Sequence, residues 1–179
     1  MKTVARDFII SVFLCSLVSS CGGGSAESSP AADSMTVSLD NGQAASYVET
    51  PSTTAPPDIG RDPYVWSRYD AANNKITLFT YAGYNGPVNS TTLEIDIAGT
   101  AAGAYPVAAT GSVFYAAPDG NLYFASPLFP GSSGAITVTR LDATAGGKVQ
   151  GTFDVIAVVR ILLHERTARL TGTFDVTRD

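Results

Sequence analysis

One pentapeptide, Gly-Thr-Phe-Asp-Val, occurs twice near the carboxyl end of the chain, at 151–155 and at 172–176. In both copies, apolar residues or glycine alternate with polar residues, which is the period of a β-strand with one buried face and one wet face. The repeat therefore predicts two strands that cover an apolar core. The alternation assigns inward positions to Phe153, Val155, Phe174 and Val176 and outward positions to Asp154 and Asp175.

The spacing of the two copies constrains how these strands pair. They lie 21 residues apart, an odd number, so a hairpin between them brings inward side chains opposite inward side chains. We place its turn near Glu165 and Arg166. This arrangement predicts three cross-strand pairs: Val155 with Val176, Ala157 with Phe174, and Val159 with Gly172.

Strand and turn signals also dominate the sequence before the repeat. The whole chain has 17 glycines and 10 prolines together with many β-branched and aromatic residues, which is typical of short strands joined by tight turns. We predict strands at 35–39, 64–70, 75–81, 92–98, 113–116, 122–126 and 135–141, with 43–49 extending the first of them. We predict loops at 50–63, 82–90, 99–110 and 127–134, and turns at 40–42, 71–74, 118–121 and 142–147.

After the first twenty residues, the apolar segment 156–166 is the one place where the sequence pattern also fits a helix. Ile156, Val159 and Leu163 could share a helical stripe, but the many β-branched residues favour a strand. The predicted fold is therefore all-β: an antiparallel β-sandwich or a small flattened β-barrel of about 8–10 strands, without a substantial helix beyond the leader.

The first twenty residues have the pattern of a secretion signal. Lys2 and Arg6 precede an apolar run of eleven residues, 8–18. Such a run spans roughly 16 Å as a helix, about half of the hydrocarbon thickness of a membrane, so it favours a cleaved signal over a permanent anchor. Cys15 leaves with the leader, and Cys21 is then the one cysteine of the mature chain.

The segment Val18-Ser19-Ser20-Cys21 resembles the lipobox of bacterial lipoproteins. The resemblance implies cleavage before Cys21 and acylation of this residue, so that the lipid bilayer becomes a partner and the protein is anchored in the cell envelope. An ordinary signal-peptidase cut near Ser20 is the alternative. The expected organisation is a signal peptide at 1–20, the lipidated cysteine and a flexible tether at 21–34, and one β-domain at 35–179.

Charge and motifs exclude several classes of function. The formal net charge of −5, without a cluster of Lys and Arg, argues against nucleic acid as a partner. No nucleotide-binding loop, nucleophile elbow or zinc-ligand set is present, so we expect no cofactor, no metal and no catalytic residue. His164 is expected in a solvated turn, and Asp119-Gly120-Asn121 in a plain turn instead of a calcium site.

Two groups of residues remain as candidates for a site. The carboxylates Glu94 and Asp96, or Asp154 and Asp175, could form an acid pair that hydrolyses polysaccharide, although outward acids also keep a sheet soluble. The aromatic residues could bind a glycan or peptide, with Arg68 and Asn85 as polar partners, or could pack a second layer of the fold. The possible ligand-binding aromatics are Tyr64, Trp66 and Tyr81, within a cluster that also contains Tyr69, Phe79 and Tyr84.

From Met35 onward the sequence resembles uncharacterised all-β domains of bacterial lipoproteins. The matching pieces are 35–42, Gly103 and Tyr105, 134–142, 151–153 and 172–174. The resemblance implies a β-sheet fold and no particular activity. We therefore expect a membrane-anchored envelope lipoprotein that serves as a non-enzymatic binding or structural module, with an envelope glycan or protein as possible partner. A carbohydrate-binding module or a small polysaccharide hydrolase is the alternative.

Overall fold

The computed structural model describes residues 32–49, 63–83, 90–161 and 164–179. The described residues contain eleven β-strands and no helix, which confirms the predicted all-β class. In chain order the strands are β1 (Ser34–Leu39), β2 (Ala45–Val48), β3 (Tyr64–Asp70), β4 (Lys75–Ala82), β5 (Thr91–Ala98), β6 (Gly103–Pro106), β7 (Gly111–Ala116), β8 (Leu122–Ala125), β9 (Ser133–Leu141), β10 (Lys148–Ile161) and β11 (His164–Thr177).

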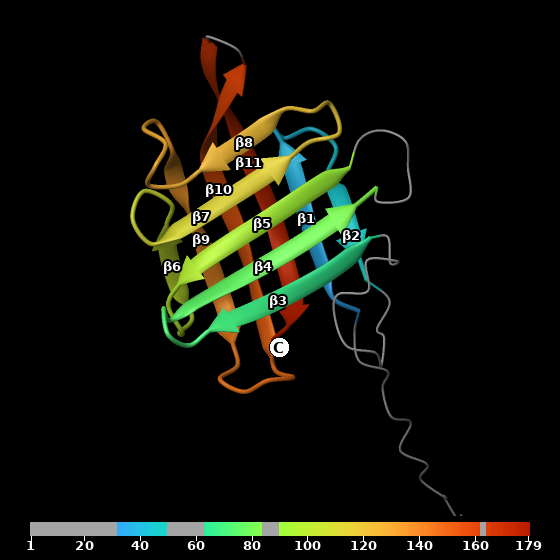
Figure 1. Cartoon of the computed structure of the whole chain (residues 1–179), viewed down its shortest axis with the longest axis vertical. Coiled ribbons are helices and arrows are strands. Elements are labelled where there is room, and N and C mark those ends of the chain that lie inside the picture. The colour runs from blue at the N-terminus through green and yellow to red at the C-terminus, as the bar shows by residue number, and fades with distance from the viewer. Residues whose placement is uncertain (1–31, 50–62, 84–89, 162–163) are drawn as a thin grey trace, which may run out of the picture.

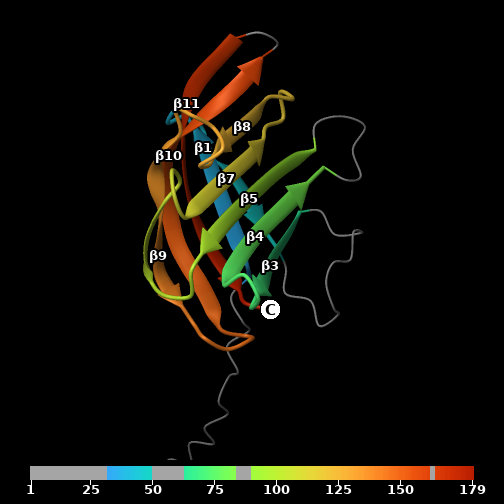
Figure 2. The same cartoon turned by 60° about the vertical axis from the view of Figure 1, so that its left-hand side comes forward.

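All neighbouring strands are antiparallel and belong to one sheet that folds over itself into a flattened, nearly closed barrel. The front layer consists of β8, β7, β5, β4 and β3, and the back layer consists of β6, β9, β10, β11, β1 and β2 (Figure 1). Figure 2 shows the two layers from another direction, with their strands crossing at an angle. The long strand β10 joins the layers because it pairs with β9 along 149–156 and with β8 at Val158 and Val159.

The two copies of the repeated pentapeptide pair with each other at the centre of the back layer. Thr152 lies opposite Thr173, Gly151 opposite Phe174, and Phe153 opposite Gly172. A Cβ atom on Gly151 would lie 2.5 Å from Cζ of Phe174, and one on Gly172 would lie 2.5 Å from Cζ of Phe153. Each phenylalanine ring therefore covers the glycine of the other copy, and both rings are buried as predicted.

The predicted register of this hairpin is wrong. Val155 pairs with Leu170 instead of Val176, and Val176 pairs with Val149. Glu165 and Arg166 belong to β11, and the connection between the strands falls at 162–163, outside the described residues. The odd spacing of the repeat requires only that inward side chains lie opposite inward side chains, and several registers meet this condition. The packing of each phenylalanine on a glycine selects one of them, with a longer hairpin than the one predicted.

Other predicted elements are confirmed, with one exception. The hairpin of β3 and β4, the hairpin of β7 and β8, the strand β5 and the pairing of 45–48 with β1 are all present. The segment 156–161 is a strand, not a helix. The exception is Gly103–Pro106, which we predicted as loop and which forms the short strand β6 against β9. The predicted loop 50–63 lies almost entirely outside the described residues.

The core lies between the two layers and follows the alternation of each strand. Leu93, Ile95 and Ile97 of β5 have no exposed surface, and Glu94 and Asp96 between them face outward. From the back layer, Met35 and Val37 of β1 meet them, together with the buried residues of β10 and β11. Burial of apolar surface on this scale is the main source of stability for such a domain.

The sheet closes where the edge strand β3 meets the end of β11. The hydrogen bonds at this junction involve side chains and do not form a backbone ladder. The Ser67 hydroxyl donates to the carbonyl oxygen of Thr177 at 2.8 Å, and the Tyr69 amide donates to Oδ1 of Asp179 at 3.0 Å. The guanidinium of Arg178 lies 4.1 Å above the Tyr69 ring. Tyr69 therefore packs on the core side at this seam, apart from the other aromatic residues of the predicted cluster.

Candidate binding surface

A row of large side chains crosses the outer face of the front layer. The strands place Trp66 of β3 opposite Phe79 of β4, Phe79 opposite Glu94 of β5, Glu94 opposite Phe114 of β7, and Phe114 opposite Phe124 of β8. Their neighbours along each strand are buried, so these five side chains point away from the core and remain partly exposed. We call these five residues the aromatic row; it crosses the strands from β3 to β8, whose order in the front layer is seen in Figure 1.

The β3 end of the row is widened by two tyrosines. Tyr64 lies opposite Tyr81, with ring centroids 5.8 Å apart in a stacked arrangement. The Tyr64 ring also lies 5.9 Å from Phe79, and Trp66 meets Phe79 edge-on at 6.4 Å. Burial, and to a lesser extent Tyr81, raises the pKa of Tyr64, so its hydroxyl stays protonated and able to donate a hydrogen bond. The predicted aromatics Tyr64, Trp66 and Tyr81 thus share one surface.

The β8 end of the row contains phenylalanines that the sequence reading did not select. The rings of Phe114 and Phe124 lie 5.1 Å apart, and Phe129 stacks on Phe124 at 4.6 Å with an angle of 11° between the ring planes. Both Phe114 and Phe124 occupy outward positions in strands that were predicted. Their common surface with Trp66 depends on the order of strands in the sheet, which alternation alone does not determine.

A shallow groove of about 370 Å³ lies at the β3 end of this surface. Both aromatic rings and polar groups line it, as expected of a site that binds and orients a polar ligand. Arg68 is exposed in the groove, whereas Asn85, its predicted companion, lies outside the described residues, as does Tyr84. The lining residues are Tyr64, Trp66, Arg68, Thr77, Phe79 and Glu94.

The two carboxylates of β5 have very different surroundings. Asp96 accepts hydrogen bonds from Thr77 Oγ1 at 2.6 Å and Ser112 Oγ at 3.1 Å, and forms an ion pair with Lys75 at 2.8 Å. Glu94 forms no hydrogen bond and no ion pair with any other residue that the structure describes. Burial raises the pKa of Glu94, the negative charge of Asp96 raises it further, and Lys75 opposes both.

In the second predicted acid pair, Asp154 and Asp175, each carboxylate is bound to residues other than the second acid. Asp154 lies in a two-pronged ion pair with Arg169, whose hydrogen bonds lower the Asp154 pKa. Asp175 meets Lys148 at 3.1 Å and accepts a hydrogen bond from Gln150 at 2.9 Å. The lowered pKa of Asp154 is the opposite of what a proton donor in glycoside hydrolysis needs, and the Asp175 carboxylate is bound to Lys148 and Gln150.

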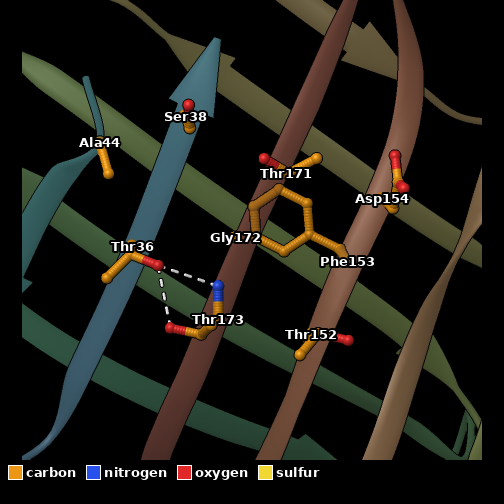
Figure 3. Close-up of a pocket in the computed structure, with 9 residues that line it drawn as sticks. All are labelled: Thr36, Ser38, Ala44, Thr152, Phe153, Asp154, Thr171, Gly172 and Thr173. Atoms are coloured by element: carbon orange, nitrogen blue, oxygen red, sulfur yellow. Dashed lines mark hydrogen bonds between the residues drawn. The ribbon is translucent and has the colours of Figure 1, made fainter. Parts of the chain in front are cut away.

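A second groove, of about 420 Å³, lies on the outer face of the back layer (Figure 3). It lies where Thr36 faces Thr173, beside Gly172. The Thr36 hydroxyl oxygen accepts the Thr173 amide at 2.9 Å and lies 2.9 Å from the Thr173 hydroxyl. Ser38 donates to the carbonyl oxygen of Gly42, and Asp154 is paired with Arg169. Because most of its polar groups already have partners, this groove is a weaker candidate than the aromatic row.

The remaining predicted positions contribute no site. His164 is the first residue of β11, so its predicted place in a turn is wrong. Asp119 accepts hydrogen bonds from the Asn121 backbone at 2.9 Å and side chain at 2.7 Å, as in a self-contained turn. The described ranges hold no group of three or more His, Cys, Asp or Glu residues that could bind a metal. Cys21 lies outside the described residues.

The fold and this surface define an antiparallel β-barrel domain with one exposed aromatic sheet face. Comparison with protein families, with curated proteins and with solved structures found no match to the chain. Within the described residues, no helix is long and apolar enough to span a membrane.

Proposed function

We propose that this protein is a lipid-anchored, non-enzymatic binding module of the bacterial cell envelope, and that the aromatic row binds a glycan. The observation that carries the proposal is the in-register line of partly exposed rings on β3, β4, β7 and β8. An exposed apolar patch of this kind, bordered by polar groups, is typical of an interaction site. Acylation of Cys21 supplies the anchor in this proposal.

The chemistry of the row suits sugar rings. The apolar C–H face of a pyranose packs on an aromatic ring, and its hydroxyls need hydrogen-bonding partners at the edges. Trp66 and Phe79 offer such faces, and Arg68 and Thr77 offer polar partners in the same groove. The row crosses four interstrand spacings, about 19 Å in total. It is therefore long enough for a glycan chain of several rings.

Hydrolysis is less well supported by the geometry. An acid-pair mechanism needs a second carboxylate that is free to attack the sugar or to activate water. Asp96, the neighbour of Glu94 on the same strand face, is held by three partners. The carboxylates of Asp154 and Asp175 are paired on the opposite layer. The arrangement supports binding without bond cleavage.

A binding screen tests the proposal directly. The full chain, purified in detergent, is tested against envelope polysaccharides and peptidoglycan fragments, in parallel with Trp66→Ala. Loss of one stacking partner is expected to weaken binding roughly tenfold. Val48→Ala is the matched control, since Val48 is 52% exposed on β2 in the other layer, and it should bind like the wild type. Absence of binding to every glycan, or equal binding by Trp66→Ala, contradicts the proposal.

A further inference from the structure

Glu94 is the unusual member of the aromatic row. It lies in the middle strand β5, and its direct neighbours on the adjacent strands are Phe79 and Phe114. Its side chain is partly buried, yet no described residue gives its carboxylate a hydrogen bond or an ion pair. A partly desolvated charge without a partner lowers the stability of the domain. Ionisable groups in such surroundings are common at functional sites, where a ligand can supply the missing partner.

The charged groups around Glu94 compensate its charge only in part, through the nearby ammonium of Lys75. On its own strand, Asp96 adds a second negative charge. On β4, the ammonium of Lys75 is bound to Asp96. On β3, Arg68 lines the same groove but is exposed and forms no ion pair with Glu94. On β7, the facing side chain is the uncharged Phe114. The Glu94 carboxylate therefore lies between two aromatic rings with no cation bound to it among the described residues.

We propose that Glu94 selects a glycan with a free amino group, such as a deacetylated amino sugar, and binds its ammonium between the rings of Phe79 and Phe114. This inference rests on the proposed glycan-binding function of the same surface. An ammonium donates charge-assisted hydrogen bonds to a carboxylate and is attracted by aromatic rings. An anionic group at this position would meet the like charge of Glu94. A metal ion would need several oxygen ligands here, and Glu94 is a single free carboxylate.

Two oligosaccharide series that differ only in acetylation test this assignment. Oligomers of glucosamine and of N-acetylglucosamine of equal length are titrated into the full chain by calorimetry at about pH 6, where an amine is largely protonated. The wild type is expected to bind the amine series at least roughly tenfold more tightly, because a hydrogen bond to a charged group is among the stronger ones. Glu94→Gln is expected to lose this preference and to retain its affinity for the acetylated series.

The protein is acidic overall, so a matched control separates the site from general charge attraction. Asp154→Asn removes one negative charge from the opposite layer, where Asp154 is exposed and paired with Arg169. It should keep the full preference for the amine series. If Asp154→Asn and Glu94→Gln reduce the preference equally, the attraction is a property of net charge and the assignment of Glu94 is wrong.

The remaining outcomes distinguish this inference from the proposed function. Equal binding of both series by the wild type, with both weakened by Trp66→Ala, overturns the selection of amines and leaves the glycan-binding surface in place. Binding of neither series, together with a negative screen of envelope glycans, overturns both. An amine preference that survives in Glu94→Gln also overturns the role of this residue.

Discussion

Glu94 illustrates how a residue that serves binding can be unfavourable for stability. Its raised pKa means that the folded state holds the proton more tightly than the unfolded state does. Stability of the wild type therefore decreases as pH rises from the ordinary glutamate value, about 4.3, through the raised value. We predict that Glu94→Gln is more stable than the wild type at neutral pH. The gain should stay below about 1 kcal/mol, because solvent screens a half-exposed group.

Denaturant unfolding of both proteins at about pH 4 and pH 7 measures this effect. The advantage of Glu94→Gln should be larger at pH 7, where the wild-type carboxylate is ionised. Asp96→Asn is the informative comparison. The three partners of Asp96 lose a charged acceptor in this variant, so the free energy of unfolding should fall. A Glu94→Gln variant that is no more stable than the wild type at pH 7 would show that the carboxylate has a compensating partner.

At the level of elements, the hairpin of β10 and β11 reverses the usual effect of glycine in a strand. Glycine in a strand interior generally weakens it relative to alanine. Here a methyl group on Gly172 would collide with the Phe153 ring and with the backbone of Thr36. We predict that Gly172→Ala lowers the free energy of unfolding by about 2–4 kcal/mol. Gly151→Ala should behave alike, because Phe174 covers it in the same way.

Thermal and denaturant unfolding of these variants checks the prediction, and Thr152 provides the control. Thr152 is exposed on the outer face of the same hairpin, so Thr152→Ala should change stability by no more than about 0.5 kcal/mol. If Gly172→Ala unfolds at the wild-type denaturant concentration, the rings do not hold the two strands together as described.

The same hairpin shows what the sequence predicts and what it leaves open. Alternation identified the inward faces of Phe153 and Phe174, because burial follows the period of a strand. The register was not predicted correctly, because many pairings place inward side chains opposite each other. The contact between Phe153 and Gly172, which distinguishes them, is visible only in the folded structure. The order of strands in the sheet was not predicted for a similar reason. Nothing in the repeat indicates that β10 pairs first with β9 and then with β8.

The candidate surface was predictable in part. Tyr64, Trp66 and Phe79 were found because they belong to one hairpin, whose two strands pair locally. Phe114 and Phe124 belong to another hairpin, and only the placement of β5 between β4 and β7 brings the two groups into one row. The unpaired state of Glu94 is a tertiary property as well, because its neighbour Asp96 has the same sequence pattern and is fully paired.

For the whole molecule, the two layers of the barrel have different outer chemistry. The front layer presents the aromatic row, whereas the back layer presents hydroxyls and ion pairs around β10, β11 and β1. The described chain enters the domain in the back layer, where Ser34 of β1 pairs with Asp175 of β11. A tether that ends there attaches to the layer opposite the aromatic row, which leaves the row accessible to envelope glycans in the proposed function.

In the proposed function this division separates anchoring from binding and gives a prediction for the whole protein. Cys21→Ser removes the sulfur that the lipobox resemblance marks for acylation, and a protein without acyl chains has no strong membrane affinity. We expect the variant to leave the membrane fraction and to bind glycan with wild-type affinity. Cell fractionation and mass spectrometry of the amino-terminal peptide measure the anchor, and the titrations measure binding. A wild-type peptide without acyl groups, or a Cys21→Ser protein that stays in the membrane, would contradict anchoring through this cysteine.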